Sequence, residues 1–362
     1  MREAAWPLIR RDLSLSYPQV GLLLSIPGIV STVVEPGLVL VSETGRRRRV
    51  VLGGGVAFTI ALLLFAAAPG FTGLLAASCL LYPASGAFVG LVQATWMDLE
   101  PASTEENMAR WVAAGSVGGV LGPLMLAAAV SLGPGWRGAA VAAAVIALPI
   151  LISVSRVRFP GPHPDTTDLR AAVRGAIAAL RRGPMLRWLT LLQLTDLLQD
   201  VFLGYAALYL VDGAGASPTL AAVGVGIFSA AALIGDTLVI GILKRMDGMR
   251  YLRWSAVGAV VAYPAFLMLG SVGAKLVLLV PLGMLRAGWY AILQARLYSE
   301  LPARGGTAVA IGAPADLLGS LLPLAIGIVA QRVGLGSAMW LLLAAPVALL
   351  TLLPVEGPRD AG

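Results

Sequence analysis

Six ionisable side chains lie within otherwise apolar stretches of this 362-residue sequence, and they are the residues best able to do chemistry there. An ionisable group in hydrocarbon is costly, so it usually faces a cavity or an opposite charge. Each of the six is therefore a candidate for binding a substrate or a coupling ion, with a static ion pair as the alternative. They are Glu35, Asp196, Asp200, Asp236, Arg286 and Asp316.

Asp196 and Asp200 are four residues apart, a spacing that puts both on one face of a helix, together with Gln193. Two carboxylates repel each other in a medium of low dielectric constant, so one of them is expected to hold a proton. This chemistry suits proton coupling or the binding of a cation. Pairing with neighbouring arginines or capping of a helix kink is the alternative interpretation.

Arg286 lies in the middle of an apolar segment, with Tyr290 on about the same helical face. Its guanidinium does not lose its proton, so it needs an acidic partner or an anionic ligand. Asp316 or one of the Asp196–Asp200 pair could be that partner. A static ion pair that holds the C-terminal half together is the alternative.

Glu35 and Asp236 lie toward the ends of their apolar segments. Glu35 precedes Pro36-Gly37, where a helix can bend. Its carboxylate could take up a proton or tie to the arginines at 46–49. For Asp236, a salt bridge with Lys244 or Arg245 is the favoured interpretation.

The composition excludes several classes of protein. Hydrophobic residues make up 58% of the sequence and charged residues 12%. In soluble domains, roughly 45–50% of the residues are apolar and about 25% are charged. A soluble enzyme, a disordered protein and a nucleic-acid binder are therefore excluded. The single cysteine, Cys79, permits no intrachain disulfide, and the single histidine, His163, makes a histidine-based metal site improbable. No cofactor or metal is expected.

Apolar runs long enough to cross a bilayer recur along the chain. A hydrocarbon core of about 30 Å needs about 20 apolar residues in a helix. The runs do not alternate between polar and apolar residues, which favours helices over barrel strands. We therefore expect an all-α polytopic membrane protein with eleven transmembrane helices, at 16–41, 49–68, 72–96, 109–131, 137–156, 188–211, 218–243, 252–271, 275–297, 308–331 and 336–355.

The positions of Lys and Arg predict the orientation of these spans. Alternate loops hold 19 and 6 of the 26 basic residues, with Arg286 left inside a span. The richer set is predicted to be cytoplasmic, which places the C-terminus in the cytoplasm. The longest loop, 157–187, separates five spans from six. Its second part, Asp165 to Arg182, has the pattern of an amphipathic helix lying on the membrane surface.

The two sets of spans show weak internal repetition. Gly45-Arg46-Arg47 and Gly248 with Arg250 each follow an apolar span on the predicted cytoplasmic side. Gly118-x-x-x-Gly122-Pro123 lies about 200 residues before a similar glycine and proline pattern at 319–323. Such repetition is typical of transporters built from duplicated halves.

On these motifs the sequence resembles the major facilitator superfamily. The segment Ser42-Glu43-Thr44-Gly45-Arg46-Arg47 resembles that family's loop between helices 2 and 3, with Ser42 where aspartate is usual and Glu43 where arginine is usual. The Gly118-x-x-x-Gly122-Pro123 pattern is similar to the helix 5 motif of antiporting members. Gly86 matches a glycine of helix 4, whereas Tyr82 stands where proton-coupled drug exporters often have arginine.

The resemblance implies twelve helices in two halves joined by a cytoplasmic loop. It divides the chain into an N-terminal bundle at 1–158 with family helices 2–6, a linker with an amphipathic helix at 159–187, and a C-terminal bundle at 188–362 with family helices 7–12. Residues 6–14 resemble the end of helix 1 and the loop after it, so we expect the sequence to start within helix 1. The two glycine and arginine loops are expected to be cytoplasmic gating loops.

The resemblance also implies a function, secondary active transport of a small organic solute by alternating access. The helix 5 motif favours export, with exchange for protons as one coupling mode; an importer of a metabolite or sugar and a non-transporting remnant are the alternatives. The sequence has no His-Glu-x-x-His, Gly-x-Ser-x-Gly or Gly-x-x-x-x-Gly-Lys-Ser/Thr pattern, which argues against an intramembrane enzyme and an ATP-driven pump. We expect a monomer in a bacterial cytoplasmic membrane, whose partners are the substrate, lipid and protons rather than nucleic acid.

Overall fold

The computed structural model describes residues 1–99, 104–157, 159, 183–299 and 317–354. These residues form helices joined by short turns, and they contain no β-strand. The all-α class predicted from the sequence is therefore confirmed.

The helices fall into two groups, separated in the sequence by residues 160–182. The N-terminal group comprises α1 (Arg2–Asp12), α2 (Tyr17–Val41), η1 (Ser42–Arg46), α3 (Arg47–Ala67), α4 (Phe71–Ser85), η2 (Gly86–Gly90), α5 (Leu91–Leu99), α6 (Thr104–Ser131) and α7 (Gly135–Ser155). The C-terminal group comprises α9 (Gly183–Thr195), η4 (Asp196–Leu198), α10 (Asp200–Leu208), η5 (Tyr209–Gly213), α11 (Pro218–Leu243), α12 (Gly248–Met268), α13 (Val272–Leu285), α14 (Trp289–Ser299), α16 (Leu322–Val333), α17 (Leu335–Met339), η6 (Trp340–Leu343) and α18 (Ala344–Leu352).

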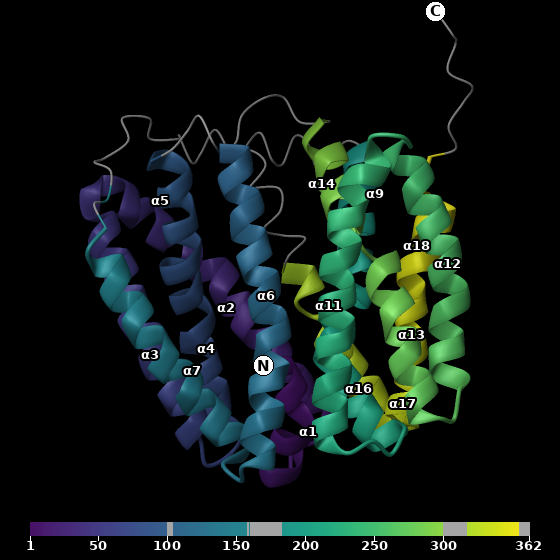
Figure 1. Cartoon of the computed structure of the whole chain (residues 1–362), viewed down its shortest axis with the longest axis horizontal. Helices are drawn as coiled ribbons and strands as arrows, with labels where there is room; N and C mark the ends of the chain where they lie inside the picture. Colours follow the sequence, from purple (N-terminus) through teal and green to yellow (C-terminus); the bar gives the residue numbers. More distant parts are fainter. Residues whose placement is uncertain (100–103, 158, 160–182, 300–316, 355–362) are drawn as a thin grey trace, which may run out of the picture.

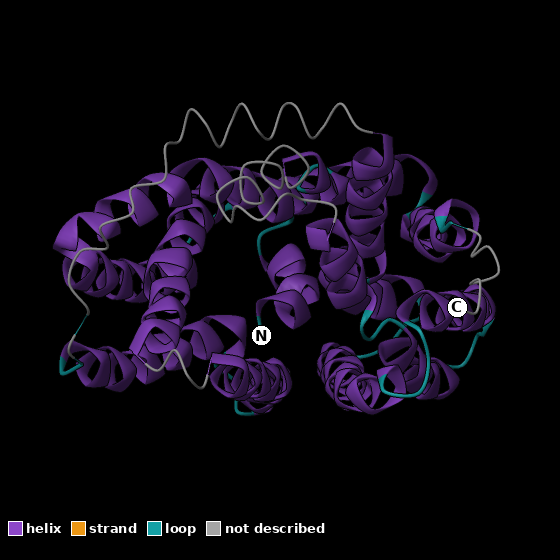
Figure 2. Ribbon diagram, turned by 90° about the horizontal axis from the view of Figure 1, so that it is seen from above, coloured by secondary structure: helices purple, strands orange, loops and turns teal. Residues whose placement is uncertain are grey.

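The two groups lie next to each other, with α2 to α7 on the left of Figure 1 and α9 to α18 on the right. Contacts join α6 with α11, α2 with α16, and α1 with both α10 and α11. The view from above in Figure 2 places the N-terminus near the centre of the molecule, between the groups. The first helix therefore belongs to the interface and not to the periphery.

Helices that could cross a membrane dominate both groups. Eight helices among the described residues are long and apolar enough to do so, and shorter apolar helices occur at Val117–Ser131 and Leu317–Val333. Each of the eleven predicted spans falls on one or more helices, except that part of 308–331 lies outside the described residues. Many large apolar side chains are exposed, including Val33 and Val261, as expected for surfaces that face lipid. The count of eleven spans stays a prediction.

The long helices α2 and α11 both begin with a serine N-cap. The Ser16 hydroxyl accepts a hydrogen bond from the Gln19 backbone, and the Gln19 side chain accepts one from Ser16 N at 2.8 Å. Ser217 likewise accepts from Leu220 N at 3.2 Å. Side chains that cap a helix satisfy backbone donors that have no partner within the helix. The helices α2 and α11 thus each start at a serine whose hydroxyl accepts a hydrogen bond from the backbone three residues later.

Several predicted single spans are interrupted where polar residues occur. The 188–211 span passes through a 3₁₀ turn, η4, and then a break at Gln199 with φ −106° and ψ −89° before α10 starts. The 275–297 span is interrupted between Arg286 and Gly288, and Gly288 has φ +73°. Glycine adopts this left-handed conformation without a steric penalty. The structure therefore corrects the continuous helices expected at these two places.

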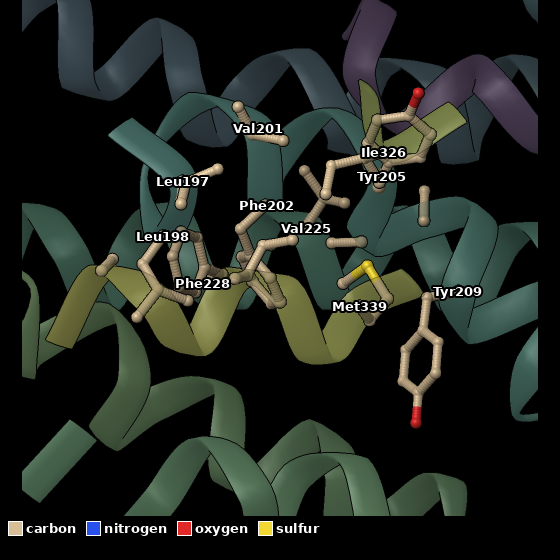
Figure 3. Close-up of a cluster of buried hydrophobic side chains, with 14 of the residues drawn as sticks. Leu197, Leu198, Val201, Phe202, Tyr205, Tyr209, Val225, Phe228, Ile326 and Met339 are labelled. Atoms are coloured by element: carbon tan, nitrogen blue, oxygen red, sulfur yellow. The ribbon is translucent and has the colours of Figure 1, made fainter. Parts of the chain in front are cut away.

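A buried aromatic cluster fixes α10 against its neighbours (Figure 3). The Phe202 ring lies 4.9 Å from the ring of Phe228 on α11 and 5.7 Å from that of Phe266 on α12. Aromatic pairs at such distances add to the free energy gained from burying their area. The packing holds the first turn of α10, which carries Asp200, in a defined place.

Lys275 has a structural role that its sequence position does not indicate. It is the first residue of the predicted 275–297 span, and its side chain is buried. Its ammonium group donates hydrogen bonds to the Tyr209 hydroxyl at 2.8 Å and to the carbonyls of Phe266 at 2.6 Å and Leu267 at 3.0 Å. These carbonyls lie in the last turn of α12, so the lysine caps that helix.

Candidate functional site

A cavity of about 710 Å³ lies between the two groups of helices. This main cavity is lined from the N-terminal group by α1, α2, α3, α4 and η2, and from the C-terminal group by α9, η4, α10 and residues 319–323. Its walls combine apolar side chains with a set of polar ones. The polar lining residues are Arg2, Glu3, Ser31, Glu35, Tyr82, Ser85, Gln193, Asp196, Asp200 and Ser320.

Glu35 points into the main cavity from α2. The hydroxyl of Ser31, one turn earlier, donates a hydrogen bond to Glu35 Oε1. A Cβ atom built on Gly86 would overlap the Glu35 carboxylate, so the glycine of helix 4 makes room for this side chain. Among the described side chains, Glu35 forms no ion pair with the arginines at 46–49, which was one of the two predicted alternatives.

Gln193, Asp196 and Asp200 reach the main cavity from the interrupted helix. Because the helix breaks between Thr195 and Asp200, the two carboxylates lie at the break and not along an unbroken face. Discontinuous membrane helices commonly form substrate and ion sites in transporters. A Cβ atom on Gly319 would overlap the Gln193 side chain, so a second glycine makes room for a polar group.

A second cavity, of about 170 Å³, adjoins the first and shares Asp200 with it. It is also lined by Asp236 and Arg286. The Arg286 guanidinium lies 5.4 Å from the centre of the Phe228 ring. Its Nε is buried and has no hydrogen-bond partner among the described residues.

Sequence reasoning predicted some of these relations and missed others. One of the aspartates named as partners for Arg286, Asp200, lines the same cavity as Arg286, but the described residues form no direct ion pair with it. The predicted salt bridge of Asp236 with Lys244 or Arg245 is wrong: Asp236 Oδ1 accepts a hydrogen bond from Gly288 N at 3.1 Å. Tyr290 is exposed and lines neither cavity. Asp316 lies outside the described residues.

Arg2 and Glu3 also line the main cavity, although the candidates named from the sequence do not include them. Arg2 Nη2 donates to Glu3 Oε1 at 2.9 Å, and the guanidinium lies 4.7 Å from the centre of the Tyr82 ring. Both residues belong to α1, whose Ala4, Ala5 and Trp6 are buried. The apolar pattern that follows them was the available signal for a buried helix.

The groups are held together at the end of the molecule that carries Arg10, Tyr17 and Asp212, here called the Arg10 end. Arg10 Nη1 lies 2.7 Å from Asp212 Oδ2, and the Tyr17 hydroxyl donates to the same oxygen at 3.0 Å. A Cβ on Gly21 of α2 would lie 2.8 Å from the Cα of Leu324. The helices α2 and α16 therefore approach closely because Gly21 has no side chain.

The helix 5 motif lies where α6 meets the C-terminal group. Pro123 Cβ is 3.7 Å from the position that a Cβ on Gly226 of α11 would take. Gly122 packs against Met1, whereas a Cβ on Gly118 would have no neighbour within 4 Å. A Cβ on Gly119 would lie 3.9 Å from Ser229 Cβ of α11, so within the motif both Gly119 and Pro123 face the opposite group.

The two predicted gating loops differ in detail. Gly45 turns the chain with φ +80° within η1, just before exposed Arg46 and buried Arg47. In the other loop a Cβ on Gly248 would meet the Ile292 side chain at 2.9 Å. Arg250 is exposed, and the carboxylate of Asp247 there lies 3.5 Å from Arg296.

An all-helical chain whose two groups of apolar helices enclose a polar cavity has the architecture of a membrane transporter. Residues 4–323 match the model of the Major Facilitator Superfamily, and the chain belongs to that family. The resemblance inferred from the motifs is thereby confirmed at the level of the family. No curated protein matches the chain significantly.

Solved structures of transporters share this fold at low sequence identity. The crystal structure of a D-xylose-proton symporter has a TM-score of 0.76 at 16% identity, covering 98% of this chain and 93% of that one. A mutant of the nucleoside transporter NupG has a TM-score of 0.75 at 13% identity, covering 97% and 94%. A bacterial homolog of the human lysosomal transporter Spinster, inward-facing and occupied, has a TM-score of 0.73 at 15% identity, covering 97% and 89%.

Proposed function

We propose that this chain is a secondary active transporter that exports a small organic solute across the cytoplasmic membrane of a bacterium by alternating access. The observation that carries the proposal is the main cavity. Both groups of helices line this cavity, and contacts between the groups close it at the Arg10 end. Alternating access needs a central site between two bodies that can rock around it. Membership of the family supports the same conclusion.

The proposed orientation places the Arg10 end outside the cell. The arginine-rich loops, including Arg46–Arg49, are at the other ends of the helices and are typical of the cytoplasmic side. With the Arg10 end closed, the main cavity would open to the cytoplasm, where an exported solute is collected. The C-terminus would also be cytoplasmic.

Two observations support exchange for protons. Carboxylates line both cavities, and Asp200 belongs to both. Protonation of Asp200 would therefore change the charge in the main cavity and also beside Arg286. Proton-coupled drug exporters often have an arginine where this chain has Tyr82, and here the Arg2 guanidinium lies over the Tyr82 ring. A cation is thus present at that place but comes from α1.

Transport by the purified full chain in proteoliposomes tests the proposal. A panel of small organic compounds is assayed with an imposed pH gradient and, separately, with a membrane potential. Wild-type protein should move at least one compound against its gradient when protons flow the other way. Asp200→Asn and Arg286→Gln should abolish this movement while thermal unfolding of the protein stays cooperative.

The control is Asp12→Asn, which removes a carboxylate outside both cavities and should preserve transport. Wild-type transport rates in the Asp200 and Arg286 variants would assign these residues a structural role. Accumulation with the proton gradient would indicate an importer. If no compound moves under either gradient, the transport proposal fails.

A further inference from the structure

The structure reveals a repeat in which Glu35 and Asp236 are equivalent. The capping serines that start α2 and α11, Ser16 and Ser217, are 201 residues apart. Glu35 and Asp236 are separated by the same 201 residues, so each lies at the same depth of its helix. The weak repetition seen in the sequence thus contains a pair of matching carboxylates.

Each of these carboxylates meets an irregular point in the chain at the end of the α-helix that lies two α-helices further along its own group, α4 after α2 and α13 after α11. The Glu35 carboxylate lies against Gly86, the first residue of the π-helical segment η2. The Asp236 carboxylate accepts a hydrogen bond from Gly288, in the turn between α13 and α14. The surroundings are therefore equivalent as well as the positions.

The two halves differ in the charge placed beside the carboxylate. Arg286 shares the second cavity with Asp236, and the residue that corresponds to it in the N-terminal group is Ser85. Ser31, which donates a hydrogen bond to Glu35, corresponds to Ala232. A guanidinium thus shares a cavity with Asp236, whereas the Ser31 hydroxyl donates to Glu35 and Ser85 lines the same cavity as Glu35.

Among the described residues that line the main cavity, no basic side chain forms an ion pair with Glu35. Arg2, the basic residue of that lining, is bound to Glu3 at 2.9 Å. Glu35, Asp196 and Asp200 line the same space, so the described lining contains more acidic than basic side chains. The wall beside Glu35 includes the Phe58 ring and the exposed side chain of Val89.

We propose that the main cavity binds an amphipathic organic cation, with Glu35 as the residue that selects its charge and Asp236 as the neutralised counterpart. This proposal rests on the proposed transport function and names the substrate class for it. A carboxylate attracts a cation in a site of low dielectric constant, and aromatic faces add a further attraction. The apolar wall receives the hydrophobic part of the molecule.

Equilibrium binding of radiolabelled tetraphenylphosphonium to the full chain in lipid nanodiscs tests the proposal, with empty nanodiscs subtracted for partition into lipid. Tetraphenylborate, which has the same shape and the opposite charge, is the matched probe. Wild-type protein should bind the cation saturably and the anion not at all. Glu35→Gln should weaken cation binding by about tenfold or more, because it removes a charge that contacts the ligand.

Glu35→Asp keeps the charge and should restore most of the binding, which separates loss of charge from loss of folding. Asp236→Asn should cost less affinity than Glu35→Gln, and Asp12→Asn, outside both cavities, should leave binding at the wild-type value. Equal binding of the anion, undiminished cation binding in Glu35→Gln, or an equal loss in Asp236→Asn would overturn the proposal. So would the absence of saturable cation binding to the wild-type protein.

Transport by the same preparation separates the two proposals. Glu35-dependent cation binding without any transport would refute the transport function and leave the cation site standing. Transport of neutral or anionic compounds by a chain that binds no cation would refute the cation site and leave the transport function standing.

Discussion

At the scale of single residues, small side chains decide where the polar ones can lie. Gly86 leaves room for the Glu35 carboxylate, and Gly319 leaves room for Gln193. Glycine in membrane helices usually serves close helix packing. Here it also admits ionisable and amide groups to a cavity, so its replacement should affect the site more than the fold.

Gly86→Ala should displace Glu35 and reduce cation binding to the level of Glu35→Gln. The atoms that a methyl group would overlap belong to the end of a flexible side chain, so the protein can accommodate the change by moving that side chain. We expect the free energy of unfolding to change by less than about 1 kcal/mol. Tetraphenylphosphonium binding and thermal unfolding of the variant measure the two effects.

Gly53→Ala is the matched control, because Gly53 is in α3, lines neither cavity, and a Cβ there has no neighbour within 4 Å. It should bind the cation as the wild type does. Equal binding in Gly86→Ala and the wild type would show that the position of Glu35 does not depend on Gly86.

At the scale of the elements, the Arg10 end is held by one ion pair and by the close approach of α2 to α16. Arg10 and Asp212 are each partly exposed, at 29% and 26%. A partly exposed ion pair contributes modestly, whereas backbone contact at Gly21 depends on shape and not on charge. We therefore expect the ion pair to shift the equilibrium between forms that are open and closed at the Arg10 end, whereas the close packing of α2 and α16 makes the closed form possible.

Asp212→Asn should shift the population toward forms that are open at the Arg10 end. A solvent-exposed pair is worth about 0.2–1 kcal/mol, so the ratio of open to closed forms should change by less than about fivefold. Distances between spin labels on α1 and η5, measured by pulsed electron paramagnetic resonance, report this ratio. Arg10→Gln should have the same effect, and combining the two changes should add little; additive effects would show that the two residues act separately.

At the scale of the whole molecule, the distribution of arginine and the position of the closed end together define the proposed orientation. Leu132 lies at the same end as Asp12 and Arg137, which are joined by an ion pair of 3.1 Å, and its side chain is 81% exposed. Arg156 lies after α7, at the opposite end of that helix. A membrane-impermeant thiol reagent distinguishes these two places.

In a Cys79→Ser background, Leu132→Cys should react with an impermeant maleimide in intact cells. Arg156→Cys should react only after the membrane is permeabilised, since basic loops favour the cytoplasmic side. The reverse pattern would invert the proposed orientation and would place the opening of the main cavity outside the cell.

The sequence alone determined the class of the protein and the approximate place of its helices. Long uncharged runs can bury their backbone polar groups in a bilayer only as helices, so their lengths and order follow from composition. Glu35, Asp196, Asp200 and Arg286 could be named for a similar reason, since a charge in an apolar run is costly enough to indicate a function or a partner.

The tertiary structure decided which of these charges meet and which partners they have. Asp236 bonds to Gly288, Arg2 joins the main cavity from the first helix, and Lys275 caps α12. Helical periodicity places a side chain on a face of its helix, but it does not say which helix packs against that face. Contacts between residues some 50 to 200 positions apart arise only when the helices assemble, and the unequal charges beside Glu35 and Asp236 become visible at that stage.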